Sequence, residues 1–342
     1  MKKLWTVILS LTMIFTFFAL PLAAKADSPD LTALANKYIT VSTNDNGTVY
    51  SNIQDFYDAA RKVFPSVQDI DLAKAVMDRT NQDYSNMTDD LILENLDFTE
   101  ISSTEAVYHL LEDGAVETLT PDEAALILQD PIAPMAEWVS EDGYIQLTTY
   151  ASAGTKGSDG TPYTLRCTAT WLKFPTWRLT DTLAIVYGGA FDDTYTITST
   201  FSETGKCDSC GSPFGWYGVE SYGSDGKDPP HFIKTSDLIE LDFAQSQAIG
   251  AKFDLKSVSC MHTDGTTYAN YAKTTSISCS IRFRVLCEST TEARAAYAHT
   301  KLTGSVTISG TVTSSGVSPS FSGSLGAIVA KYCSAPLTLR HK

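Results

Sequence analysis

The chain has 342 residues, of which 43% are hydrophobic and 19% charged, a composition typical of folded rather than disordered proteins. Its formal net charge is -15. Nucleic-acid binders and proteins that bind anionic membrane surfaces need basic surface, so no nucleic-acid partner is expected.

The first 26 residues have the pattern of a secretion signal. Lys2 and Lys3 precede an uncharged apolar run from Leu4 to Leu22, and Ala24-Lys25-Ala26 supplies a small-residue cleavage site. No later apolar stretch reaches the roughly 20 residues that cross a bilayer. We therefore expect a secreted, extracellular protein with no membrane span after signal removal, rather than one held by an uncleaved anchor.

Charge and cysteine content divide the rest of the chain in two. Residues 27–140 contain 22 acidic and 5 basic side chains, whereas residues 141–342 contain 18 acidic and 17 basic ones. All seven cysteines lie in the second part. This contrast predicts a signal peptide over residues 1–26, an acidic, mainly helical module over 27–135, and a Ser/Thr-rich, disulfide-bearing domain over 136–342.

The acidic module is predicted to contain several short helices. Apolar residues recur at helical spacing from Ile53 to Phe64, Ser51 and Gln54 suit a capping box, and Pro65 ends the helix. Further helices are predicted through 70–77 and shortly after residue 88.

The end of the module combines a hairpin with a strong helix start. Residues 106–120 favour a hairpin that turns at Asp113-Gly114. Thr120-Pro121-Asp122-Glu123 then joins a hydroxyl cap, a proline in the first helical turn and a glutamate that can reach back to the cap.

The second part alternates apolar and polar residues over many short runs. The clearest runs from Ile277 to Cys287, with serines and arginines between the apolar residues. Such alternation is typical of half-buried strands, and no helical pattern interrupts the runs. The fold class that we predict is therefore a small, mainly α-helical acidic module followed by an all-β antiparallel sandwich or barrel.

The cysteines are expected to form disulfides in an oxidising compartment. Cys279 and Cys287 are about 27 Å apart on one strand and cannot bond to each other. The three candidate pairs are Cys260–Cys279, Cys207–Cys210 and Cys287–Cys333. The first of these pairs would lie across a hairpin with its tip near Asn270. Because seven is odd, at least one thiol stays unpaired or bonds to another molecule. Zinc and redox alternatives for Cys207–Cys210 lack the required sequence context.

No catalytic motif is visible. The chain has no Gly-x-Ser-x-Gly elbow and no His-Glu-x-x-His, and none of its five histidines lies in a triad context. Asp192-Asp193 and the segment 44–47 are interpreted as turns, and Arg178 and Asp181 as a local ion pair. We expect no cofactor and no metal site.

An aromatic, glycine-rich stretch is the best candidate for binding. It covers residues 211–232 and is expected to be a loop, whose flat aromatic faces can stack on sugars or pack against a partner. The candidate binding residues are Trp216, Tyr217, Tyr222, His231 and Phe232. The competing interpretation is that they cover one end of the sandwich.

These observations favour a secreted, non-catalytic extracellular binding or structural protein, with carbohydrate or a protein surface as its partner. Two alternatives remain open. One is an extracellular hydrolase without a recognisable motif, for which carbohydrate is a candidate substrate. The other is a secreted toxin or precursor whose acidic module is removable.

Overall fold

A computed structural model describes the chain from residue 30 to residue 341, with internal gaps. The gaps are 45–46, 83, 85–86, 88, 112–114, 130–142, 159, 174–179, 189–194, 207–212, 225–230, 235–238, 243–247, 255–257, 262–266, 271, 286–288, 301–305, 314–315, 324–327 and 334–336. The predicted signal and the Asp113-Gly114 and Asp192-Asp193 turns lie outside the described residues.

Short helices occur near the N-terminus, as predicted. They are α2 (Leu31–Tyr38), α3 (Ile53–Val63), α4 (Asp69–Arg79), α5 (Asp89–Leu93) and α6 (Pro121–Gln129), with a 3-10 turn η1 (Glu94–Asp97). The sequence analysis did not anticipate α2. Among the described helices, none is both long and apolar enough to cross a membrane.

The two predicted capping boxes have different outcomes. At α6 the Thr120 backbone N–H donates to the Glu123 carboxylate at 2.9 Å, and the Thr120 hydroxyl donates to it at 2.7 Å. At α3 the prediction was wrong, because the N-cap is Asn52, in the left-handed region with φ 62° and with no side-chain cap bond. The Gln54 amide donates to Asp58 one turn further on.

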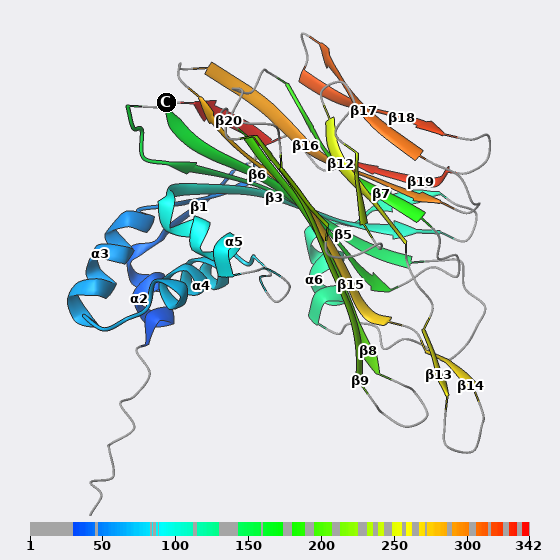
Figure 1. The fold of residues 1–342 in the computed structure, drawn as a ribbon, viewed down its shortest axis with the longest axis horizontal. Helices are drawn as coiled ribbons and strands as arrows, with labels where there is room; N and C mark the ends of the chain where they lie inside the picture. The colour runs from blue at the N-terminus through cyan, green and yellow to red at the C-terminus, as the bar shows by residue number, and fades with distance from the viewer. Residues whose placement is uncertain are drawn as a thin grey trace, which may run out of the picture.

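Most of the residues that the structure describes form two antiparallel sheets (Figure 1). In spatial order, the ten-stranded sheet contains β1 (Thr40–Asn44), β2 (Gly47–Ser51), β3 (Phe98–Leu110), β5 (Gly143–Gly154), β6 (Thr161–Lys173), β15 (Ala272–Val285), β8 (Tyr195–Lys206), β9 (Pro213–Ser224) and β10 (His231–Lys234). β4 (Val116–Thr118) pairs with β3, which confirms the predicted hairpin.

The six-stranded sheet covers one face of the first. Its order is β11 (Ile239–Asp242), β12 (Ala248–Asp254), β7 (Thr180–Tyr187), β16 (Ser289–Thr300) and β19 (Ile328–Cys333), while β20 (Leu337–His341) also pairs with β16. Two separate hairpins are β13 (Val258–Met261) with β14 (Thr267–Asn270), and β17 (Val306–Thr313) with β18 (Gly316–Gly323). Neither sheet closes on itself over the described strands, so the barrel alternative was wrong and the antiparallel class is confirmed.

The layers follow from strand alternation. Leu183 and Ile185 of β7 enter the core between the two sheets. Their neighbours Ala184 and Val186 point the other way and pack with Ile308 of the β17–β18 hairpin. Because both faces of β7 are covered, its residues 183–186 form a continuous apolar run instead of an alternating one.

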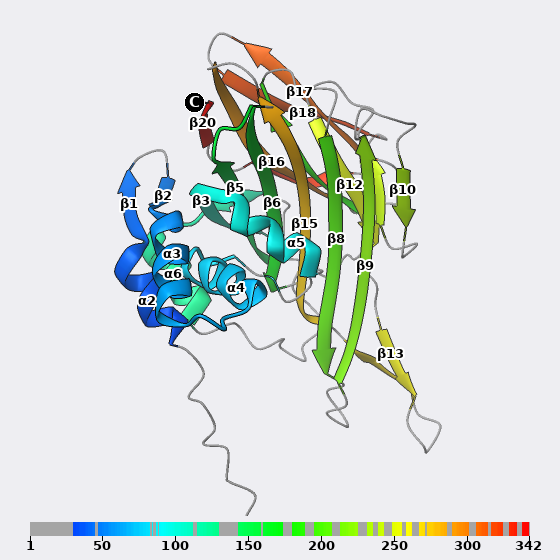
Figure 2. The ribbon, with the colours of Figure 1, turned by 60° about the vertical axis from the view of Figure 1, so that its left-hand side comes forward.

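The helices cover the opposite face of the ten-stranded sheet along β2, β3 and β5 (Figure 2). Ile53 and Phe56 of α3 pack in one cluster with Ile101 of β3 and Tyr150 of β5. Gly47 allows β2 to approach β3, since its φ is +115° and a Cβ there would lie 2.2 Å from the Ser103 carbonyl oxygen. The predicted acidic module therefore supplies strands to the large sheet as well as helices.

Two residues of α3 test whether this helical layer is stabilised by burial. Ile53 is fully buried, whereas Val63 is 57% exposed. We expect Ile53→Ala to lower the free energy of unfolding by about 2–5 kcal/mol, because it removes buried methyl groups and leaves a cavity. Val63→Ala, the matched control, should change it by less than about 0.5 kcal/mol in urea unfolding. Equal losses would show that the layer does not pack as described.

The capping box at α6 predicts a titration. The Thr120 backbone N–H, and next its hydroxyl, donate to the ionised Glu123 carboxylate and hold the pKa of Glu123 below its usual value. Since the folded-state pKa is lowered, this contribution to helix stability is present above the ordinary glutamate pKa and is lost as the pH falls through the lowered one.

Carboxyl NMR titration should therefore give Glu123 a pKa below that of an ordinary glutamate. Thr120→Ala should raise this pKa again, but only in part, because the backbone donor remains. A titration unchanged by Thr120→Ala would contradict the role of the hydroxyl.

Candidate functional site

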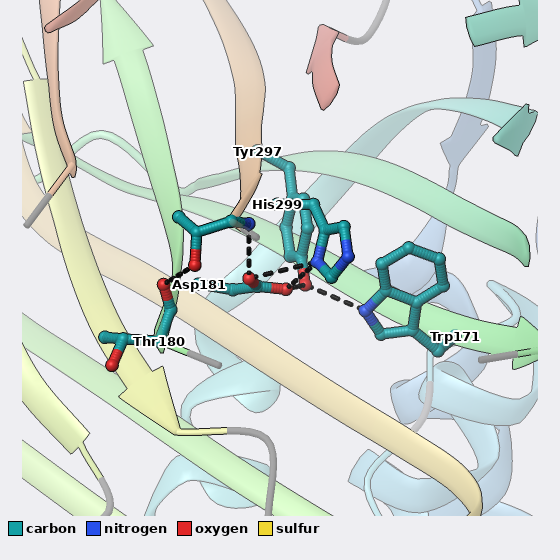
Figure 3. Close-up of polar contacts among 6 residues, drawn as sticks. Trp171, Thr180, Asp181, Tyr297 and His299 are labelled. Atoms are coloured by element: carbon teal, nitrogen blue, oxygen red, sulfur yellow. Dashed lines mark hydrogen bonds and ion pairs between the residues drawn. The ribbon is translucent and has the colours of Figure 1, made fainter. Parts of the chain in front are cut away.

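A polar cluster, buried except at Thr180, lies between the two sheets (Figure 3). We call it the Asp181 network; it consists of Trp171, Thr180, Asp181, Tyr297, His299 and Thr300. Trp171 comes from β6 of the ten-stranded sheet, whereas the other five come from β7 and β16 of the six-stranded sheet.

The sequence brings these residues together through alternation on paired strands. Asp181 precedes Leu183 and Ile185 on the face of β7 that enters the core, and Tyr297 follows Ala293 and Ala295 on the same face of β16. β7 and β16 pair antiparallel, with Tyr297 opposite Leu183. The carboxylate therefore lies beside the aromatic side chains of β16.

The Asp181 carboxylate is saturated with donors. It accepts a 2.5 Å bond from the Tyr297 hydroxyl, a 2.9 Å bond from His299 Nδ1 and a 3.0 Å bond from the Thr300 backbone N–H. A buried carboxylate needs such partners, because it has lost its hydration. This arrangement assigns the Nδ1 proton to His299 whether the ring is neutral or charged.

The network also joins the two sheets directly. Trp171 Nε1 donates to the Tyr297 hydroxyl at 2.8 Å, and the Trp171 ring packs edge-on against His299 with centroids 5.3 Å apart. A second polar link between the sheets lies nearby, since the Ala295 backbone N–H donates to the Thr149 hydroxyl of β5. These bonds fix the relative position of β6 and β16 inside an otherwise apolar core.

An Asp–His pair is also the orienting half of a catalytic triad, in which the far ring nitrogen handles the proton of a nucleophile. Here the side chains of Asp181 and His299 are both 0% exposed. His299 Nε2 has no hydrogen-bond partner in the part of the chain that the structure describes. In this arrangement His299 of β16 is linked to Asp181 of β7 inside the core.

No motif in the sequence predicted this network. It predicted an ion pair between Asp181 and Arg178, but Arg178 lies outside the described residues and Asp181 instead bonds to residues 116 to 119 positions away. One signal was available in the sequence. Asp181 comes just before the apolar run 183–186, and Tyr297 and His299 stand in an alanine-rich strand, so these polar groups must meet a partner when they are buried.

The five predicted binding residues lie on strands at one edge of the ten-stranded sheet. The expectation of a loop was wrong for residues 213–224 and 231–234, which form β9 and β10. Register also separates the five. Trp216, Tyr222 and Phe232 share one face, and Tyr217 and His231 occupy the other.

Pairing across the sheet shows which face is which. We follow directly opposite residues across the sheet from β9 to β6. Trp216 lies in one cross-strand row with Glu203, Thr275 and Trp171, and Tyr222 lies in one such row with Leu165. Trp171 and Leu165 belong to the core between the sheets. Trp216, Tyr222 and Phe232 therefore occupy core-side positions, and Tyr217 and His231 occupy the outer face.

His109, another of the five histidines, lies outside the Asp181 network. Its ring stacks on Tyr144 with ring centroids 4.3 Å apart. No group of three or more His, Cys, Asp or Glu side chains among the described residues is arranged to hold a metal ion.

The structure describes some of the cysteines and not others. Cys207, Cys210 and Cys287 lie outside the described residues, and the backbone alone places Cys260 in β13, Cys279 in β15 and Cys333 in β19. The hairpin expected near Asn270 differs, because β13 turns back into β14 and Cys260 lies opposite Tyr268. The three disulfide pairings stay predictions.

Comparison with known proteins gives no assignment. No protein-family model matches the chain, and no curated protein matches it. One solved structure with a weak likeness is described as "Pore forming protein", with 7% sequence identity and a TM-score of 0.23 over 68% of this chain and 90% of that one. A TM-score this low carries no argument about fold or function.

Replacing the Tyr297 hydroxyl tests the Asp181 network. Tyr297→Phe removes one donor to the carboxylate and the acceptor of the Trp171 bond, so we expect the free energy of unfolding to fall by about 1–3 kcal/mol. Tyr38→Phe, in the partly exposed position at the end of α2, is the matched control and should cost less than about 0.5 kcal/mol. Urea unfolding of both variants decides, and equal midpoints would contradict the assigned role.

Proposed function

We propose that this is a secreted, non-catalytic extracellular binding protein built on a sandwich of two sheets, and that it binds extended carbohydrate. The binding surface is the outer face of β15, β8, β9 and β10. The observation that supports it most is the register of the ten-stranded sheet, which gathers hydroxyl-bearing positions on that one face.

The hydroxyl positions form adjacent rows. On β8 they are Thr196, Thr198, Thr200 and Ser202, and on β15 the facing positions are Ser276, Ser278 and Ser280. Ser and Thr hydroxyls both donate and accept, which suits the hydroxyl groups of a sugar. The helices pack along β2, β3 and β5, at the other end of the sheet. Figure 2 shows β8 and β9 to the right of these helices.

Two of the predicted binding residues flank these rows. Tyr217 is opposite Ser202, and His231 is opposite Gly223, which in turn faces Thr196. Six residues of strand separate the two positions, a distance of about 20 Å. A ligand that touches both is extended, so a polysaccharide fits this surface better than a single sugar.

The remaining aromatic candidates have a structural role in this proposal. Trp216, Tyr222 and Phe232 occupy core-side positions, and Phe232 lies directly opposite Tyr222. Directly opposite aromatic residues stabilise a sheet, so we assign this pair to the sheet and not to the ligand.

The alternatives receive less support. The Asp181 network is a sealed Asp–His pair and offers no exposed base for a hydrolase. A removable acidic module would have to take β3 with it, and β3 lies inside the sheet, paired with β2 on one side and with β5 along most of its length.

Register-matched variants test the binding proposal. On a panel of immobilised polysaccharides, we expect Tyr217→Ala and His231→Ala each to lower affinity about tenfold or more, because each removes one end of the contact surface. Both variants should keep the wild-type unfolding midpoint. Tyr222→Ala and Phe232→Ala should do the reverse and lower the midpoint while binding persists at low temperature.

Two results would contradict this proposal: no binding by the wild-type protein to any polysaccharide of the panel, or loss of binding only in the core-side variants.

Chain cleavage tests the removable-module alternative. A specific protease site placed within residues 131–142 should yield two fragments that co-elute on gel filtration, because β3 and β5 are paired over the length of the strands. Separation of the fragments without denaturant would favour the precursor. A variant with the same insertion and no protease is the control.

A further inference from the structure

Two cysteines that the sequence places 112 positions apart stand opposite each other in the ten-stranded sheet. Cys167 of β6 and Cys279 of β15 are direct partners in an unbroken antiparallel ladder that runs from Thr275 opposite Trp171 to Val285 opposite Thr161. Neither end of this ladder is near them, so the register is fixed on both sides.

The spacing of an antiparallel ladder suits a disulfide. Directly opposite residues have Cα atoms about 4.5 or 5.5 Å apart, depending on whether the pair is hydrogen-bonded. Both values lie within the roughly 4.4–6.8 Å that disulfides span. Directly opposite residues also share a face of the sheet, so no strand has to rotate or slip to bring the two positions together.

The face in question is the one that enters the core. Cys167 is 0% exposed and packs in the core between the sheets with Leu165 and Ala169 on either side of it along β6. A bond at this place would be protected from reductants once the six-stranded sheet covers it. It would also join β6 and β15, which are the neighbouring strands of this sheet that lie farthest apart along the chain.

We propose that Cys167 and Cys279 form a disulfide bond in the exported protein. The oxidant is a disulfide of the exported compartment, carried by a thiol oxidoreductase or a small thiol. One thiolate attacks that disulfide and releases one of its thiols, and the second cysteine then attacks the mixed disulfide and releases the other. Two protein thiols lose two electrons and two protons, and one external disulfide becomes two thiols.

This pairing changes the expected set of disulfides. It uses Cys279, which the sequence analysis paired with Cys260, and it leaves the candidate pairs Cys207–Cys210 and Cys287–Cys333 intact. Cys260 is then the odd thiol. It stands in β13, opposite Tyr268, in a two-stranded hairpin separate from both sheets.

Peptide mapping of the exported full-length protein, alkylated with N-ethylmaleimide in denaturant without reductant, tests the bond directly. We expect a cross-linked pair of peptides containing Cys167 and Cys279, and alkylation of Cys260. Recovery of Cys167 and Cys279 as alkylated peptides would overturn the proposal. So would either of them joined to a different cysteine. The measurement does not depend on carbohydrate binding, so the two proposals fail separately.

Variants distinguish a bond from two packed thiols. If the bond exists, Cys167→Ala, Cys279→Ala and the double variant should lower Tm by similar amounts, roughly 5–10 °C, because each removes the same cross-link. Reductant should lower the wild-type Tm to a similar value and leave the variants unchanged. Cys260→Ala is the matched control and should resemble the wild type in both conditions.

Two results together would show that the thiols only pack against each other. The Tm losses of the two single variants would add up in the double variant, and the wild-type protein would keep its Tm after it is unfolded in denaturant with reductant and refolded. That result would overturn the proposal even where mapping is incomplete.

Discussion

The burial of β7 on both faces is the constraint on which the other layers depend. A strand between two apolar layers needs one cover on each side, and β7 obtains them from the ten-stranded sheet and from the β17–β18 hairpin. Alanines line the hairpin side, at Ala184, Ala248, Ala296 and Ala298, and allow a close approach. The large sheet then has its own second face to cover, which the N-terminal helices do in part.

The Asp181 network places a carboxyl group and its polar partners inside this apolar assembly. Replacement of buried polar groups by well-packed apolar groups is often neutral for stability, so the network is weak evidence that the protein is stable. Its stronger effect is on alignment. A carboxylate that needs donors from Tyr297, His299 and Thr300 disfavours any slip of β7 against β16, which would otherwise exchange one small apolar residue for another.

Local patterns predicted local structure well. The helix from Ile53, the capping box at Thr120 and the hairpin after residue 106 each depend on residues a few positions apart. The Asp181 network and the opposition of Cys167 and Cys279 depend on partners more than 100 positions away, and no spacing in the sequence encodes which strands become neighbours. The aromatic residues of the stretch 211–232 stand out in the sequence, but its glycines favour a loop over a strand. Only the strand places Tyr217 and Trp216 on opposite faces of the sheet.

The position of β15 between β6 and β8 has a consequence for how the chain reaches its fold. A chain that emerges from its N-terminus first delivers β6 and β8 long before β15, so the large sheet has two facing open edges until residues 272–285 arrive. Pairings of such long range are slow to form, and unpaired edges attract strands of other chains. The edges of β6 and β8 are therefore the places where another chain can pair with this sheet before residues 272–285 arrive.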